Sequence, residues 1–351
     1  MLTLHNSQHD QKVFCAHLAP IAPLLDDPAV IEIMINGPDT VFAERLGSVE
    51  KVPVKLAAAN ISGAYKALAS INDQDHHPIL DCRMPQLRVA MALTPIAVHG
   101  PAMAIRKHRT SARKLQQYLE EGLFEPGQPR VRRIVARGDT PDISGGGQAL
   151  YDFLVWLVQS RMNYLLAGST SAGKTTFLNA LISMIPDLER LIVIEDTTEL
   201  IVSLSNYLQL EANPDIGVSI AALVRLALRM RPDRICIGEV RGATAYDLMD
   251  ALNTGHPGSA ATLHADSPEQ ALPRLESMIR QAPQAANWPL AAMRAQIAST
   301  FRYVIFASKE AGRAPESIVE ILGVDDRGEY RFKPLYSRFA DNDAAFSIAM
   351  P

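Results

Sequence analysis

A short glycine-rich stretch, GSTSAGKT (168–175), has the residue types and the spacing of a phosphate-binding loop. Gly168 is followed by four residues and then by Gly173, Lys174 and Thr175, the pattern G-x-x-x-x-G-K-[ST]. Glycines let the main chain turn tightly and point successive N–H groups at β- and γ-phosphate oxygens, and a helix beginning there adds its positive end. The Lys174 ammonium supplies a point charge, and the Thr175 hydroxyl is suited to ligate Mg²⁺. The residues expected to hold the phosphates are Gly168, Ser169, Thr170, Ser171, Ala172, Gly173, Lys174, Thr175 and Thr176.

Two glutamates follow strand-like apolar runs further along the chain. Glu195 closes the first run, and Glu239 lies near the end of RPDRICIGEVRG (231–242). Acids at strand ends face the crevice where α/β sheets bind ligands, and a carboxylate beside the Mg²⁺ shell can orient or deprotonate the attacking water. Glu239 is therefore expected to act on that water and to reach the metal through water. Gly238 stands where many proteins with a phosphate-binding loop of this kind, the P-loop ATPases, carry an Mg²⁺-linked aspartate. The metal is therefore expected to be bound by Thr175, phosphate and waters. The alternatives are a solvated acid for Glu239, and a capping or ion-pairing role for Glu195.

The segment NTGHPGSAATLHADSP (253–268) contains two histidines. His256 lies in a Gly/Pro turn, and His264 follows a strand of small residues. Taken alone, each histidine fits a structural role better than a catalytic one, and a zinc pair without a nearby cysteine or third ligand is not expected. The small residues at 258–261 permit close approach of the main chain to phosphate or to a neighbouring strand.

The elements that must position these residues alternate between strand and helix. NYLLA (163–167) reads as a buried strand, and TTFLNALISM (175–184) as a helix with an apolar face. This alternation continues from residue 148 onward and predicts an α/β domain with a mostly parallel sheet over 148–351.

The residues before 108 show a different order of strand-like and helical segments. Strand-like VIEIMING (30–37) and LRVAMALTPIAV (87–98) flank a helical stretch at 61–71, which predicts a small α+β domain over 1–107. Residues 108–147 begin with a charged helix candidate, SARKLQQYLEEGLF (111–124). They continue with prolines, clustered arginines and a run of three consecutive glycines at 145–147, a composition typical of a linker.

Composition narrows the class of protein. The chain has 351 residues, 48% of them hydrophobic, with a net charge of −4 and a pI near 6.2, which argues against a protein that mainly coats nucleic acid. Its three cysteines show no C-x-x-C pair, so neither a disulfide framework nor a thiolate zinc site is indicated, and a reducing cytosol fits best. No apolar run reaches the roughly 18 residues needed to span a bilayer, and the first residues lack the order of a signal peptide. We therefore expect a cytoplasmic protein whose membrane contact is peripheral.

Four segments in fixed order resemble the secretion traffic ATPases of the type II and type IV secretion superfamily. GSTSAGKT is similar to that family's Walker A, IEDTTEL to its aspartate box, MRPDRICIGEVRG to its Walker B and TGHPGSAATLHA to its histidine box. LLDDPAVIEIMINGPDTVFAERLG and LRVAMALTPIAVHGPAMAIRK resemble segments of the family's amino-terminal domain. The resemblance covers most of residues 20–335, leaves 125–147 unmatched, and is greatest to the conjugal-transfer branch, the TrbB-type ATPases.

The resemblance implies a homohexameric ring of chains, each with a PAS-like amino-terminal domain and a RecA-like P-loop motor domain. Such a ring would hydrolyse ATP with Mg²⁺ to power type IV secretion, conjugative transfer and pilus biogenesis. Its place would be the cytoplasmic face of the bacterial inner membrane. Its partners would be inner-membrane secretion components and other secretion ATPases, and we expect no stable sequence-specific binding of nucleic acid.

The resemblance also assigns roles to individual residues. Lys174 and Thr175 would bind phosphate and Mg²⁺, and Glu239 would be the Walker B acid. The remaining assignments are Glu195 as the aspartate-box acid, His264 as the diagnostic histidine, Arg88 and Arg106 as arginines that reach the γ-phosphate from the smaller domain, and Arg241 as a contact across subunits. Without the resemblance, Arg88 and Arg106 are ordinary solvated charges. Hydrolysis would release the arginine contacts and let the domains swing.

Three other functions fit parts of the pattern. A pilus retraction motor or a type II secretion ATPase shares the motifs, although assembly and type II motors usually carry a four-cysteine zinc module that three dispersed cysteines cannot supply. A hexameric DNA-translocating RecA-like motor shares the architecture and is disfavoured by the acidic pI. A docking platform that binds ATP with little turnover is disfavoured by Glu239 and favoured by Gly238.

Overall fold

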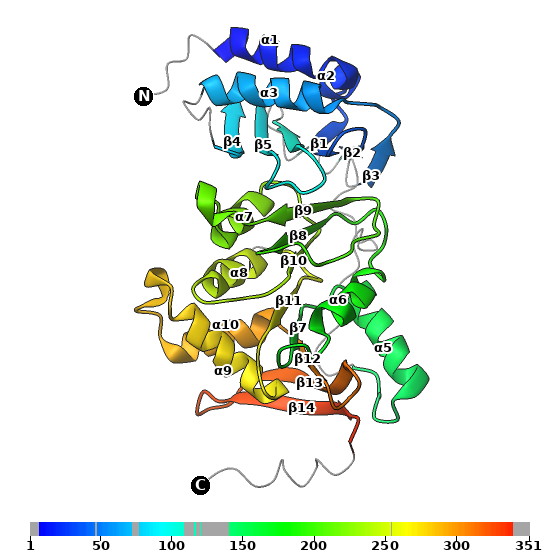
Figure 1. Ribbon diagram of the computed structural model, residues 1–351, viewed down its shortest axis with the longest axis vertical. Helices are drawn as coiled ribbons and strands as arrows, with labels where there is room; N and C mark the ends of the chain where they lie inside the picture. Colours follow the sequence, from blue (N-terminus) through cyan, green and yellow to red (C-terminus); the bar gives the residue numbers. More distant parts are fainter. Residues whose placement is uncertain are drawn as a thin grey trace. The chain divides into compact units, whose positions relative to one another are not determined.

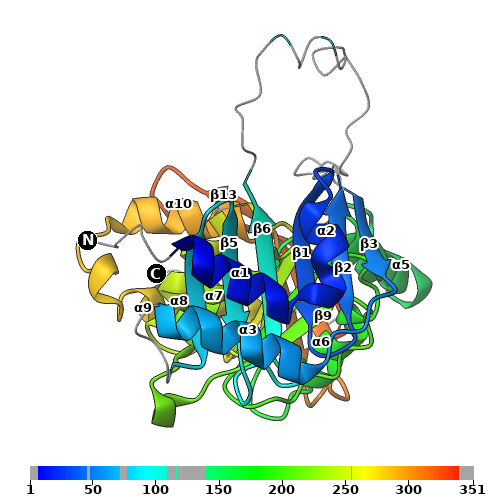
Figure 2. The same ribbon diagram turned by 90° about the horizontal axis from the view of Figure 1, so that it is seen from above.

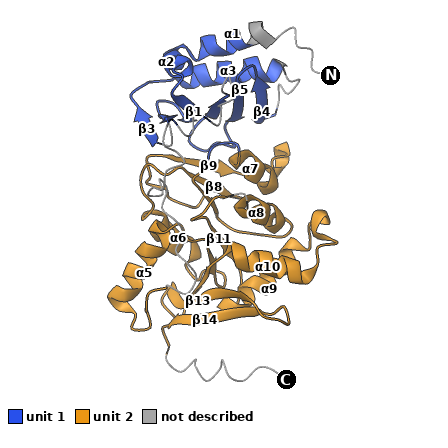
Figure 3. Cartoon of the chain, turned by 180° about the vertical axis from the view of Figure 1, so that it is seen from behind, with its two compact units in different colours: residues 1–133, 229–231 blue, residues 134–228, 232–351 orange. Residues whose placement is uncertain are grey.

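The structure is a computed structural model that describes residues 7–45, 48–71, 77–108, 116, 120, 140–253 and 255–339. The chain divides into two compact units (Figure 3). Unit 1 comprises residues 1–133 and 229–231, and unit 2 comprises residues 134–228 and 232–351. Most of the linker expected over 108–147, including nearly all of the expected helix at 111–124, lies outside the described residues.

Unit 1 contains a six-stranded sheet in the order β3-β2-β1-β6-β5-β4, with every neighbouring pair antiparallel. Its strands are β1 (Val30–Asn36), β2 (Val41–Arg45), β3 (Ser48–Val52), β4 (Ile79–Met84), β5 (Leu87–Ala92) and β6 (Ala102–Lys107). Its helices are α1 (Ser7–His17), the 3-10 turn η1 (Ala19–Ile21), α2 (Ala22–Asp26) and α3 (Ala58–Ile71). Figure 2 shows these helices over one face of the sheet.

The alternation of side chains along the strands builds the core of unit 1. Ile33, Val89 and Ile105 point to the face covered by the helices, where they join Phe14 and Leu68 in one buried cluster. The α+β arrangement expected from the sequence is therefore present. The strand expected over 87–98 is shorter, because β5 ends at Ala92 and the chain turns at Thr94 and Pro95. Proline has no N–H with which to continue the ladder.

Unit 2 contains an eight-stranded mixed sheet in the order β14-β13-β12-β7-β11-β10-β8-β9. The six strands from β12 to β9 in this order are parallel, and β13 and β14 add an antiparallel hairpin. The strands are β7 (Tyr164–Ala167), β8 (Leu191–Glu195), β9 (Tyr207–Glu211), β10 (Arg234–Ile237), β11 (Ala260–Leu263), β12 (Tyr303–Ser308), β13 (Ala314–Val324) and β14 (Tyr330–Ser337). The mostly parallel sheet expected from residue 148 onward is confirmed, whereas the hairpin was not expected.

Helices cover both faces of this sheet, as Figure 1 shows. One face carries α5 and α6, and the other carries α7 to α10. The helices are α5 (Gly147–Gln159), α6 (Lys174–Ile182), α7 (Ile220–Ala227), α8 (Thr244–Asn253), α9 (Pro268–Ile279) and α10 (Leu290–Thr300), with 3-10 turns η2 (Pro214–Ile216) and η3 (Pro283–Ala285). Strands covered on both faces are mostly apolar, which explains the fully buried runs YLLA in β7 and LIVI in β8.

Four loops leave the carboxyl ends of the parallel strands at one edge of the sheet. They follow β7, β8, β10 and β11, and each contains one of the motifs singled out in the sequence. Parallel strands bring loops that are distant in sequence to the same crevice. The topology of unit 2 therefore gathers the candidate site residues.

Candidate active site

The loop between β7 and α6 needs glycine at both ends. Gly173 has φ +89°, and a Cβ atom there would lie 2.7 Å from the Cβ and carbonyl oxygen of Arg313. Gly168 has φ +155°, and its Cβ would lie 2.3 Å from the carbonyl oxygen of Ala307. A side chain at residue 168 would collide with strand β12, and one at residue 173 would collide with the β12–β13 connection. The main chain is thus held in an open curve at the start of α6, where helix N–H groups favour an anion.

Lys174 is the first residue of α6, and its side chain returns over the loop. The residue is 9% exposed, and Nζ donates to the carbonyl oxygens of Gly168 and Ser169 at 2.9 Å each. Burial lowers the pKa of Lys174, and the nearby Glu239 carboxylate partly opposes that effect. The lysine therefore holds the loop closed over its own ammonium group, a position from which it can transfer its hydrogen bonds to phosphate oxygens.

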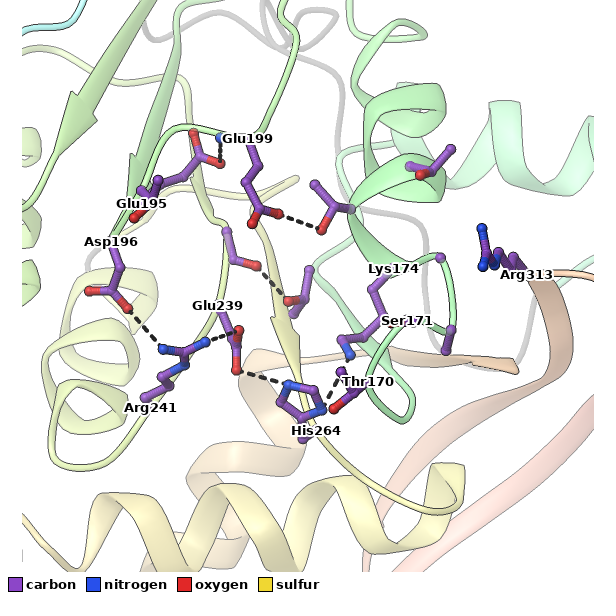
Figure 4. A pocket seen from close by; sticks show the side chains of 17 residues that line it. Thr170, Ser171, Lys174, Glu195, Asp196, Glu199, Glu239, Arg241, His264 and Arg313 are labelled. Atoms are coloured by element: carbon purple, nitrogen blue, oxygen red, sulfur yellow. Dashed lines mark hydrogen bonds and ion pairs between the residues drawn. The ribbon is translucent and has the colours of Figure 1, made fainter. Parts of the chain in front are cut away.

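His264 joins this lysine to the glutamate that follows β10. Its Nδ1 lies 3.4 Å from Lys174 Nζ, and its Nε2 lies 3.1 Å from Glu239 Oε1 (Figure 4). An ammonium can only donate, so the bond to Lys174 requires an unprotonated Nδ1; Nε2 then carries the hydrogen and donates to Glu239. This assignment of the neutral tautomer follows from the hydrogen-bond partners. The histidine is thereby placed between Lys174, which is predicted to bind phosphate, and Glu239, which is predicted to be the Walker B acid.

Glu239 is held by a second neighbour, Arg241. The arginine donates from one terminal nitrogen to Glu239 Oε2 at 2.7 Å, and its other terminal nitrogen lies 3.8 Å from Asp196 Oδ2 (Figure 4). The hydrogen bond from Arg241 is the largest cause of the lowered pKa of Glu239; burial opposes it, and the charges of Arg241 and Lys174 add to it. Both carboxylate oxygens are therefore occupied by protein donors. Arg241 itself is two-thirds exposed, with 66% of its side chain accessible.

Glu195 and Glu199, both on the strand and loop of the aspartate box, are in different environments. Glu195 is buried, and its Oε1 accepts from the main-chain N–H groups of Glu199 and Leu200 at 3.0 Å each. Its Oε2 accepts from Gln209 at 2.8 Å. The Glu199 carboxylate instead lies in the cavity, where the Thr175 hydroxyl donates to it at 3.3 Å. Glu195 shapes the loop, and Glu199 is the acid beside the hydroxyl expected to bind metal.

The packing around Glu195 also accounts for Gly238. A Cβ atom at residue 238 would lie 2.8 Å from the Cγ of Glu195, so no aspartate fits there without displacing that buried side chain. Two hard oxygen donors, Thr175 and Glu199, remain beside the loop, and they suit Mg²⁺ chemically.

These residues line one cavity of about 580 Å³ in unit 2. Its walls come from the loop and α6 (170–176), from the segments after β8 and β10, from β11 with His264, and from Arg313 in the β12–β13 turn. The motifs in the sequence predicted most of these positions, but Glu199 and Arg313 were not among the predicted residues. The second acid of IEDTTEL could have indicated Glu199, whereas no local pattern marks Arg313.

Three further residues singled out in the sequence do not line this cavity. Arg88 and Arg106 belong to β5 and β6 of unit 1, where Arg88 donates to Asp81 at 3.1 and 3.0 Å and Arg106 is exposed. Their contact with nucleotide remains a prediction that rests on the family resemblance. His256 lines a different cavity, at the amino ends of the strands, with its Nδ1 3.4 Å from the carbonyl oxygen of Ala251. This supports the structural role expected for His256.

Comparison with known proteins places this geometry in a family. The type II/IV secretion system protein family matches residues 139–308. The type IV secretion system protein VirB11 of Brucella suis is 33% identical over 292 residues, which cover 79% of this chain and 81% of that protein. This chain belongs to the type II/IV secretion ATPase family.

Further relatives show which branch of the family this secretion ATPase resembles. The conjugal transfer protein TrbB of Rhizobium radiobacter is 35% identical over 270 residues, covering 74% of this chain and 75% of that protein. The crystal structure of the VirB11 ATPase of Brucella suis in complex with sulphate matches with a TM-score of 0.72 at 32% identity, covering 84% of this chain and 92% of that one. The chain is thus a VirB11/TrbB-type type IV secretion ATPase, similar to both at comparable identity. Across the described residues, no helix combines the length and the apolar character needed to cross a bilayer.

Proposed function

We propose that this secretion ATPase hydrolyses ATP in the cavity of unit 2 to power type IV secretion or conjugative transfer. The observation that carries the proposal is the chain of contacts from Lys174 through His264 to Glu239. These contacts lie beside a loop that requires glycine at both of its ends. It joins the group that binds phosphate to the group that can accept a proton from water. The sulphate complex of the VirB11 relative agrees with this, since sulphate resembles a phosphoryl group in shape and charge.

The residues divide the work according to their surroundings. The N–H groups of the loop and the start of α6 bind the phosphate chain, and Lys174 exchanges its two carbonyl partners for phosphate oxygens. Thr175 and Glu199 would hold Mg²⁺, which would neutralise negative charge on the phosphates.

Glu239 then orients the attacking water and accepts its proton. Its lowered pKa keeps it ionised at neutral pH, and Arg241 must release Oε2 before water can take that place. Arg241 is exposed and can move to a partner outside its own chain. Lys174 and His264 remain on the other side of the carboxylate and hold it in line.

The assembly that we propose is a homohexameric ring on the cytoplasmic face of the bacterial inner membrane, in contact with other type IV secretion components. The strand order of unit 2 supports a RecA-like motor, and the helix-covered antiparallel sheet of unit 1 supports a PAS-like domain. A ring accounts for an exposed arginine beside the catalytic acid, because a neighbouring chain can compete for it.

Phosphate release from ATP by the purified full chain tests the proposal. We expect turnover that requires Mg²⁺, is abolished by a chelator and is lost in Lys174→Ala. The matched control is Lys333→Ala, which removes an exposed lysine on β14 far along the sequence from the loop. The proposal fails if the wild type releases no more phosphate than Lys174→Ala.

A further inference from the structure

Arg313 differs from the other cations of the cavity in its partners. Lys174 bonds to two carbonyl oxygens and His264, and Arg241 pairs with Glu239 and Asp196. The side chain of Arg313 is exposed on the cavity wall and, among the described residues, makes no hydrogen bond or ion pair. A solvated arginine beside a phosphate-binding loop is available to an anionic ligand.

The main chain of Arg313 is fixed against the loop. Its Cβ and carbonyl oxygen define the close approach to Gly173, and its own φ of +61° is unusual for a residue other than glycine. The turn is held by hydrogen bonds to Ser308, whose carbonyl oxygen accepts from Arg313 N and whose hydroxyl accepts from Ala311 N, at 2.9 and 3.0 Å. Strained conformations that the surroundings impose are often found at functional sites. The guanidinium is therefore carried on a short, rigid support that touches the loop directly.

The position of Arg313 decides which part of a nucleotide it can meet. Figure 4 shows it on the opposite side of the loop from Glu239 and Arg241. The phosphoryl group that is cleaved must lie next to Glu239 and Lys174, so the nucleoside end of the phosphate chain extends away from them. We propose that Arg313 binds the phosphate chain on its nucleoside side, at the α- and β-phosphates, and fixes the nucleotide in the cavity. This inference rests on the proposed binding of ATP.

The contact has two consequences that separate it from a γ-phosphate contact. ADP and ATP share the α- and β-phosphates, so loss of Arg313 weakens both to the same degree. A charge contact also tolerates lysine, because an ammonium binds phosphate as a point charge, whereas stacking on the base would not. The variants to compare are Arg313→Asn and Arg313→Gly, which remove the charge and tolerate positive φ, and Arg313→Lys, which keeps the charge.

Calorimetric titration of ADP, and of ATP without Mg²⁺, into the full chain tests the proposal. We expect both affinities to fall by about tenfold or more in Arg313→Asn and Arg313→Gly, and by only about threefold in Arg313→Lys. Lys309→Ala removes an exposed cation of the same turn that does not line the cavity, and it should bind like the wild type. Thermal unfolding of each variant shows whether the fold is kept.

Three results would overturn the assignment. Wild-type affinity in both charge-removing variants would leave Arg313 without a role in binding. A lower affinity for ATP with an unchanged affinity for ADP would place Arg313 at the γ-phosphate. Equal losses of affinity in Arg313→Lys and Arg313→Asn would show that stacking or shape, and not charge, makes the contact. A wild-type chain that binds neither nucleotide would instead refute the proposed function itself, and this outcome is recognised before any variant is compared.

Discussion

Among single residues, Glu239 is held by a short hydrogen bond from an arginine. Arg241 donates to Glu239 at 2.7 Å and is the largest cause of the lowered pKa of that glutamate. A lowered pKa keeps the carboxylate charged further into the acid range, where a proton acceptor is still competent. In the proposed mechanism, Arg241 therefore extends activity toward low pH even though it moves aside when water takes its place.

The pH dependence of turnover tests this role of Arg241. In Arg241→Ala the pKa of Glu239 rises, so the acid limb of the kcat/KM profile moves to higher pH. The control is Arg225→Ala, which removes an exposed arginine paired with Asp247 outside the cavity and leaves the profile in place. If the acid limb lies at the same pH in Arg241→Ala and the wild type, that limb does not report the ionisation of Glu239.

The two acids of the aspartate box respond differently to the same substitution. Glu195→Gln places an amide NH₂ or a weaker acceptor against two main-chain N–H groups, so the free energy of unfolding falls by about 1–3 kcal/mol. Glu199→Gln leaves the melting temperature near that of the wild type and raises the Mg²⁺ concentration needed for half-maximal turnover. Thermal melts and Mg²⁺ titrations measure both effects. Equal melting temperatures with a changed Mg²⁺ requirement in Glu195→Gln would exchange the two assignments.

At the scale of elements, the phosphate-binding loop and the β12–β13 turn form one packed unit. Gly173→Ala forces a Cβ against Arg313 at 2.7 Å in addition to the strain of positive φ, whereas Gly312→Ala has positive φ with open space around the Cβ. We expect Gly173→Ala to lose nucleotide affinity and at least about 1 kcal/mol more stability than Gly312→Ala. Chemical denaturation and ADP titration provide the comparison. Similar losses in both variants would show that φ alone, and not the packing of the two elements, requires glycine.

The sequence could predict elements better than contacts between them. The runs of β7, β8 and β10 and the start of α6 follow from local periodicity and from the loop motif. Glu199 was missed because its approach to Thr175 depends on the path of a loop that the buried Glu195 shapes. Arg313 was missed because a hairpin far along the chain brings it to Gly173. Such long-range packing leaves no local signal.

For the whole molecule, the exposed position of Arg241 beside Glu239 favours an assembly in which a neighbouring chain completes the proposed site. We expect ring oligomers, with hexamers most abundant, that become tighter with an ATP analogue. Mass photometry of the purified chain at micromolar concentration measures the distribution. A single species of 38.4 kDa in the presence of the analogue would contradict the ring.

A comparison of Glu239→Gln with the wild type, for both binding and turnover of ATP, shows whether Glu239 takes the proton from water. Glutamine keeps the shape of the side chain and can still accept hydrogen bonds, but its amide cannot take a proton from water. We predict ATP affinity within about threefold of the wild type and turnover reduced by about 100-fold or more. Comparable turnover in Glu239→Gln and the wild type would show that the proton acceptor is not Glu239, the acid held between Arg241 and His264.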